Sequence, residues 1–165
     1  MADLLTHVLA AYVLLTVASW RIDAIGSEWT PVGMGGAAIP DLIKVGIVVD
    51  NGAIEGVIGV PFSYAPVSTL GGVLLIAGAI TLAFERRYWR RAYAFLFVGG
   101  LASLVLDGLR AFADGNSNPW LYPFAWWQPP TPSLYVTSDP RVAVVGIVVA
   151  AVVFAVDRRL EPDFS

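Results

Sequence analysis

The stretch Leu4-Leu-Thr-His7-Val-Leu-Ala-Ala-Tyr-Val-Leu-Leu-Thr-Val-Ala-Ser-Trp20 decides the fold, because it is apolar or weakly polar except for one histidine. About 20 helical residues cross the hydrocarbon core of a bilayer, so this run predicts a membrane-spanning helix if Ala2 and Asp3 extend it. His7 is the only histidine of the chain. An ionisable residue inside such a run is costly and is by default a functional-site candidate. Asp3 lies four residues earlier, on the same face of the predicted helix.

The composition is that of an integral membrane protein. Of the 165 residues, 57% are hydrophobic and only 14% are charged. Soluble domains carry about 25% charged residues, so this chain has too few to cover a surface that faces water. No stretch shows the alternating pattern of an outer-membrane strand. The composition therefore predicts an all-α membrane bundle that forms a single transmembrane domain over residues 1–165.

Charge and cysteine content exclude several classes of function. The chain has no cysteine, so it has no disulfide framework and no thiolate metal site. Its net charge of −3 argues against nucleic acid as a partner. Lys44 is the only lysine, and a composition rich in arginine and acidic residues suits a salt-adapted organism such as a halophilic archaeon. The first charged residue is Asp3, whereas a cleavable signal peptide begins with positive charge, so the first helix is expected to be retained.

Four further apolar runs extend the prediction to about five spans. They are Val32–Val49, Val67–Phe84, Ala92–Leu109 and Val142–Val156. The second run is expected to be broken at Pro40, because proline cannot donate a backbone hydrogen bond inside a helix. Irregular backbone at membrane depth persists only where protein or a water-filled cavity satisfies it. Asp41 follows this break directly and is therefore a second site candidate.

The distribution of arginine predicts the orientation in the membrane. Short loops rich in arginine stay in the cytoplasm, which places the clusters at 85–91 and 157–159 inside the cell. With five spans the N-terminus is then outside, the C-terminus is cytoplasmic, and the long loop rich in Trp and Pro at 110–139 is extracytoplasmic. In a four-span alternative, residues 32–60 are wholly re-entrant and the N-terminus is inside.

This orientation brings polar residues from several helices to one depth. Asp3 and His7 lie near the outer end of the first span, whereas other polar groups open the third span and close the fourth. These other groups are Ser68, Thr69, Ser103 and Asp107. Polar groups that converge between bundle helices are typical of a binding site. The loop at 110–139 could lie across this site as a lid.

The chemistry of these groups favours a divalent metal. Imidazole and carboxylate oxygens suit zinc, manganese or magnesium, so His7, Asp41 and Asp107 are candidate metal ligands. Asp3 could instead orient the ring of His7 as a hydrogen-bonding partner that does not touch the metal. A metal held there could activate a bound water for hydrolysis.

Each candidate also has a purely structural interpretation. His7 could be a neutral core histidine bonded to Thr6, Asp3 or a carbonyl group. Asp107 could pair with Arg110, and Asp41 could pair with Lys44 after capping a broken helix. The serines could serve helix packing alone.

Four short motifs give the chain a resemblance to a known family. They are Leu-Leu-Thr6-His7, Ala38-Ile-Pro40-Asp41, Ser68-Thr-Leu-Gly-Gly72 and Ser103-Leu-Val-Leu-Asp107. In order and spacing they resemble the membrane-bound metal-dependent hydrolases (the YdjM-like inner-membrane hydrolases). The resemblance implies a helical bundle in which His7, Asp41 and Asp107 hold a metal. It also implies hydrolysis of an ester or phosphoester by metal-activated water at an outward-facing site.

The chain departs from this family at two positions. Ser68 and Ser103 stand where the family has histidine, and serine hydroxyls are weak ligands for a divalent ion. The departure implies weakened metal binding and a non-catalytic descendant. The alternative function is a membrane scaffold that binds a partner protein through the Trp/Pro loop or its glycine-lined helix faces. A third possibility is a small transporter that relays protons through Asp41 and His7.

Overall fold

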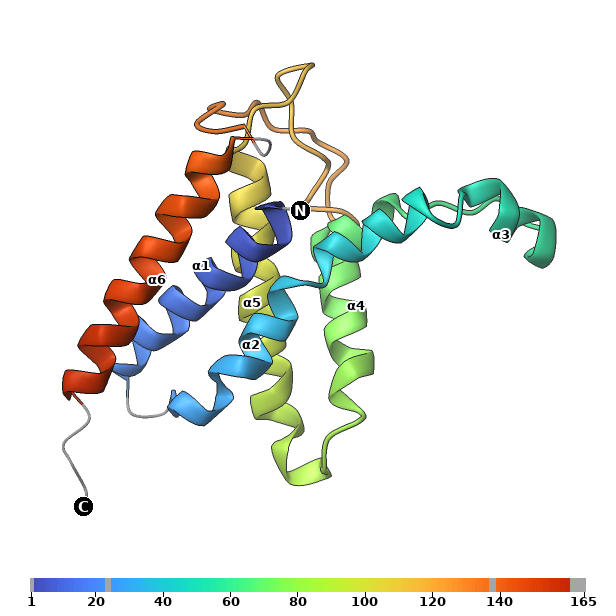
Figure 1. The fold of residues 1–165 in the computed structure, drawn as a ribbon. Coiled ribbons are helices and arrows are strands. Elements are labelled where there is room, and N and C mark those ends of the chain that lie inside the picture. Colours follow the sequence, from blue (N-terminus) through green and yellow to red (C-terminus); the bar gives the residue numbers. More distant parts are fainter. Residues whose placement is uncertain (1, 23–24, 137–138, 161–165) are drawn as a thin grey trace.

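The computed structural model describes residues 2–22, 25–136 and 139–160, and it describes Ala2 and Asp3 by their backbone alone. This part of the chain folds into helices and irregular segments without a β-strand. The α-helices are α1 (Ala2–Ser19), α2 (Thr30–Ala37), α3 (Asn51–Ile58), α4 (Leu70–Thr81), α5 (Trp89–Leu109) and α6 (Pro140–Leu160). Short 3-10 helices are η1 (Ser27–Trp29), η2 (Pro40–Ile47), η3 (Ala65–Ser68) and η4 (Arg86–Tyr88). All the α-helices except α3 stand in one bundle (Figure 1).

The lengths of the helices support a membrane bundle. Among the described residues, two helical segments are long and apolar enough to cross a bilayer, namely Arg86–Leu109 and Pro140–Leu160. A third span is obtained if Ser27–Ile47 and Asn51–Ile58 count as one bent span. The apolar helices α1 and α4 are shorter, and α4, with 12 residues, extends about 18 Å at 1.5 Å per residue. Two or three spans therefore follow from helix length.

The predicted break at Pro40 is present. Helix α2 ends at Ala37, and the chain resumes as η2 at Pro40. The sequence predicted that the second run ends or kinks at Pro40, and helical structure continues beyond Pro40 as η2. The bend of 84° lies farther along the chain, between Ser27–Ile47 and Asn51–Ile58, and α3 has no buried residue. The segment from η2 to α3 reaches sideways from one end of the bundle (Figure 1).

Glycine allows α2 and α5 to approach closely. A Cβ atom added to Gly99 would collide with the carbonyl oxygen of Gly33, and one added to Gly36 would collide with that of Leu96. Small residues at helix crossings serve this purpose in membrane bundles, where lipid removes the hydrophobic drive for helices to associate. The second predicted span therefore packs through its glycines, although it is short.

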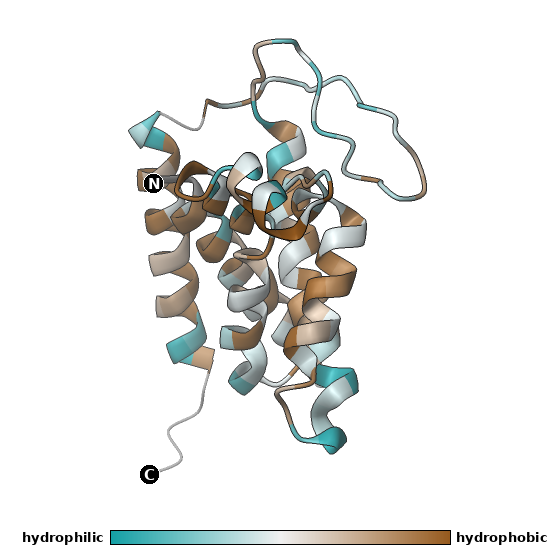
Figure 2. Cartoon of the chain, turned by 90° about the vertical axis from the view of Figure 1, so that its right-hand side faces the viewer, coloured by the Kyte–Doolittle hydropathy of each residue, from teal (hydrophilic) through white to brown (hydrophobic). Residues whose placement is uncertain are grey.

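Two apolar clusters fill the bundle. One consists of Ile39, Val73, Ala77, Leu96 and Leu104, and the other of Leu15, Trp29, Ala92 and Phe95. Most of α6 faces outward, because only Ala150 and Val153 of this helix are buried. Hydrophilic residues gather towards the ends of the helices and in the long loop (Figure 2). This distribution is the one expected of a bundle surrounded by lipid.

The two ends of the bundle differ in character. At one end, Trp20 donates a hydrogen bond of 2.7 Å from its indole nitrogen to Asp157, and Arg91 lies 3.3 Å from Glu28. The start of α1, the end of α5, the long loop and the start of α6 lie at the other end (Figure 1). The predicted separation of the arginine clusters from the polar site residues is therefore confirmed within the molecule.

Candidate functional site

His7 is wholly buried between three helical elements. Its side chain has 0% exposure, and so does that of Ser103 on α5. The Nδ1 atom of His7 lies 2.9 Å from the Oγ atom of Ser103. This hydrogen bond joins residues 96 positions apart and ties α1 to α5.

Two carboxylates approach the imidazole ring of His7, each at a different nitrogen. The Oδ2 atom of Asp41 lies 4.0 Å from Nδ1, and the Oδ1 atom of Asp107 lies 3.6 Å from Nε2. Asp41 is carried by the first turn of η2, so the break at Pro40 is what brings it to the ring. Asp107 follows Ser103 by one helical turn on α5 and therefore shares its face. The predicted convergence of His7, Ser103, Asp41 and Asp107 is confirmed.

Each carboxylate also has a cationic neighbour. The ammonium nitrogen of Lys44 lies 2.7 Å from Oδ1 of Asp41, and a guanidinium nitrogen of Arg110 lies 3.4 Å from Oδ1 of Asp107. Asp41 is thus paired with Lys44 and Asp107 with Arg110, as the structural interpretation predicted, and both carboxylates also lie near His7. Among the described residues, each carboxylate therefore has a cation beside it that offsets its charge. We refer to His7, Ser103, Asp41, Asp107, Lys44 and Arg110 as the His7 cluster.

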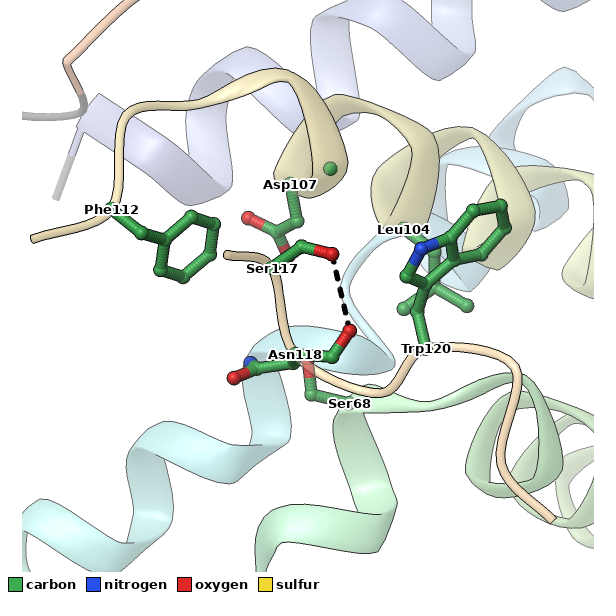
Figure 3. A pocket seen from close by; sticks show the side chains of 8 residues that line it. Ser68, Leu104, Asp107, Phe112, Ser117, Asn118 and Trp120 are labelled. Atoms are coloured by element: carbon green, nitrogen blue, oxygen red, sulfur yellow. Dashed lines mark hydrogen bonds between the residues drawn. The ribbon is translucent and has the colours of Figure 1, made fainter. Parts of the chain in front are cut away.

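Ser68 and Thr69 lie at the start of α4, as predicted, but they have different structural roles. Thr69 caps the helix, because its hydroxyl oxygen accepts a hydrogen bond of 3.2 Å from the backbone nitrogen of Gly72. Ser68 lines a small cavity beside Asp107 (Figure 3). The cavity volume of about 10 Å³ gives room for about one water molecule.

The long loop closes this cavity. Ser117, Asn118 and Trp120 line it together with Leu104, Asp107 and Phe112 (Figure 3). The loop is fixed over the start of α4, because the backbone nitrogen atoms of Leu70 and Gly71 donate to the carbonyl oxygens of Trp120 and Tyr122, at 2.7 and 2.8 Å. The interpretation of the loop as a cover over the site is consistent with this arrangement. The individual lining residues of the loop were not identified from the sequence, although Trp120 belongs to its aromatic cluster.

The three predicted metal ligands do not fit a single ion in this arrangement. Asp41 faces Nδ1 of His7 and Asp107 faces Nε2, whereas one metal ion bonds only one nitrogen of a given imidazole, at about 2.0–2.1 Å for zinc. Lys44 and Arg110 already neutralise the two carboxylates. Within the described ranges, no group of three or more His, Cys, Asp or Glu side chains is arranged to hold a metal ion. The predicted fourth member, Asp3, has its side chain outside the described part of the chain.

Comparisons with known proteins identify no relative. No protein-family model, no curated protein and no solved structure matches this chain. The function must therefore be argued from the residues themselves.

Proposed function

We propose that this chain is a non-catalytic, multi-pass membrane protein related to the metal-dependent hydrolases, in which the His7 cluster acts as a structural clamp. The observation that carries the proposal is the position of the His7 ring between two carboxylates that are each already paired with a cation. These contacts tie α1, η2 and α5 together.

Burial supports the clamp over catalysis. The only side-chain hydroxyl bonded to His7 is that of Ser103 among the described residues, and both side chains have 0% exposure. A serine nucleophile must meet its substrate, whereas a structural hydrogen bond is best formed away from water. The serine that stands in place of a family histidine therefore completes the clamp.

The clamp accords with five passes and an outward N-terminus. In this orientation the His7 cluster lies near the outer surface, and the arginine clusters at 85–91 and 157–159 lie in the cytoplasm. The short helices α1 and α4 then cross the membrane within the bundle, where the longer α5 and α6 flank them. As a scaffold, the protein would offer a partner the exposed aromatic side chains Phe124, Trp126 and Trp127 of the long loop.

Hydrolysis is the second candidate, and the cavity beside Asp107 favours it. A water molecule held between Asp107 and Ser68 would lie against a carboxylate that is backed by His7, which is the arrangement of a general base. Asp107 would take a proton from that water as its oxygen attacks the ester or phosphoester, and would return the proton to the alcohol oxygen as the bond to the leaving alcohol breaks. Movement of the loop that carries Trp120 would be needed to admit a substrate, because the cavity has room for about one water molecule.

Assays of the purified full chain in lipid nanodiscs separate the two functions. Wild type, Asp107→Asn and His7→Ala are tested on ester and phosphoester substrates with and without added zinc, manganese or magnesium. If the cluster is a clamp, wild type should turn over no substrate faster than the two variants, with or without added metal. Turnover in wild type that both substitutions abolish would establish hydrolysis and overturn the clamp.

A further inference from the structure

A long apolar groove runs along the outside of the bundle between α1 and α6. Its outer part, of about 340 Å³, is lined by Leu106, Tyr135, Arg141 and Val145 among others. Its inner part, of about 310 Å³, is lined by residues such as Leu9, Val13 and Val149. Thr6 and Gly146 line both parts, so the two parts adjoin.

The groove has the length and lining of a site for a hydrocarbon chain. It extends along α6 from Arg141 to Val149, which is eight residues or about 12 Å at 1.5 Å per residue. Helix α6 faces outward along its length, with Val145 and Val149 at 61% and 42% exposure. At membrane depth an apolar groove of this size holds hydrocarbon and not water. A Cβ atom added to Gly146, where the two parts meet, would lie 3.7 Å from Leu9 at an ordinary contact distance, so alanine fits there and only a larger side chain would fill the groove.

The outer end of the groove carries a positive charge. Arg141 lies one residue after the start of α6, and none of the described carboxylates forms an ion pair with it. Its guanidinium group offers the planar donor fork that binds phosphate oxygens. The N-terminal end of α6 is already capped by a carboxylate, because Oδ1 of Asp139 accepts a hydrogen bond of 2.9 Å from the backbone nitrogen of Arg141, so the guanidinium group is the cation available to a ligand. An apolar groove with a cation at its outer end complements a chain that ends in an anionic group.

We propose that this groove binds one phospholipid of the surrounding bilayer, with an acyl chain between α1 and α6 and its phosphate at Arg141. The site adjoins the His7 cluster, because Thr6 and Leu106 precede His7 and Asp107, but it uses none of the cluster's side chains. It therefore stands whether the cluster is a clamp or a catalytic centre.

Photocrosslinking tests the site. The full chain is placed in phosphatidylcholine nanodiscs that contain a small fraction of phosphatidylglycerol with a photoreactive acyl chain, and the adducts are mapped by mass spectrometry. We expect adducts to concentrate on groove residues of 9–14 and 142–149. Gly146→Leu, which fills the groove, and Arg141→Gln, which removes the phosphate partner, should each reduce them at least threefold.

Val152→Leu is the matched control, because Val152 is exposed on α6 and lies outside the lining of the groove. It should leave the adducts unchanged. Gly146→Ala is a smaller substitution at the same position, and it should retain at least half of the adducts because it leaves most of the groove open. It serves as a second variant in case Gly146→Leu fails to fold. Adducts spread evenly over α6, or equal adducts in wild type, Gly146→Leu and Arg141→Gln, would overturn the proposal.

Discussion

The imidazole of His7 on α1 and the hydroxyl of Ser103 on α5 share a hydrogen bond of 2.9 Å in the interior of the bundle. Both side chains are wholly buried. Water therefore does not compete with either group for this hydrogen bond. This contact and the two flanking carboxylates are the basis of the proposed clamp.

Ser103→Ala should destabilise the bundle. The substitution removes a hydroxyl and leaves Nδ1 of His7 without that hydrogen bond, which costs about 0.5–1.5 kcal/mol of unfolding free energy. Thermal or denaturant unfolding in detergent micelles measures the loss. Ser19→Ala is the control, since the Ser19 hydroxyl bonds only the carbonyl of Thr16 within its own helix in the described structure. Equal stability of Ser103→Ala and wild type would argue that the buried hydrogen bond contributes nothing.

The pair of Asp107 and Arg110 should show energetic coupling. Asp107→Asn removes the carboxylate that lies 3.4 Å from the guanidinium of Arg110, so the double variant with Arg110→Gln should lose less stability than the sum of the two single losses. A coupling of about 0.5–3 kcal/mol is expected for neighbours in one network. The exposed pair of Glu85 and Arg87, 2.8 Å apart, is the control cycle and should give weaker coupling. Strict additivity at Asp107 and Arg110 would contradict the balance of charges in the clamp.

Two neighbouring glycines of α2 should respond in opposite ways to alanine. At Gly36 a Cβ would collide with the backbone of Leu96 on α5, so Gly36→Ala should push α2 and α5 apart and cost about 1–3 kcal/mol. At Gly35 nothing lies within 4 Å of the added atom. Gly35→Ala should therefore be neutral or stabilising by up to about 1 kcal/mol, because alanine favours the helix. Unfolding measurements that found the two variants alike would refute the close packing of α2 on α5.

The orientation can be tested by labelling introduced cysteines, because the chain has none of its own. Asn116→Cys in the long loop should react with a membrane-impermeant maleimide added to intact cells. Tyr88→Cys, beside the arginine cluster, should react only after the cells are opened. Labelling of Tyr88→Cys from outside would reverse the orientation and place the His7 cluster at the cytoplasmic surface.

The sequence predicted the positions of the site residues better than it predicted the course of the chain between them. His7, Ser103 and Asp107 stand in long helices, where hydrophobic run length and the helical repeat suffice to place them on faces and at depths. Asp41 was recognisable because Pro40 must interrupt a helix. The direction in which the chain leaves that break is set by tertiary contacts, so the sideways course of η2 and α3 was missed.

The contacts of the long loop could not be derived in advance. Trp120 and Tyr122 fix it through their backbone carbonyl oxygens, which bond the free nitrogens at the start of α4. Every residue has a backbone carbonyl group, so the sequence does not indicate which of them will form these hydrogen bonds. The approach of Asp41 and Asp107 to different nitrogens of the ring could not be predicted either, because the spacing of residues along the chain does not determine which nitrogen each carboxylate approaches.

The metal dependence of folding stability tests the clamp most directly. The melting temperature of the full chain in lipid nanodiscs is measured after treatment with a chelator and after addition of zinc, for wild type and His7→Ala, with metal content determined on the same samples. We expect wild type to contain no stoichiometric divalent metal, to melt at the same temperature in both conditions, and to exceed His7→Ala in both. Stoichiometric metal in wild type, with a rise in melting temperature on zinc addition that His7→Ala abolishes, would contradict the clamp and restore the metal centre.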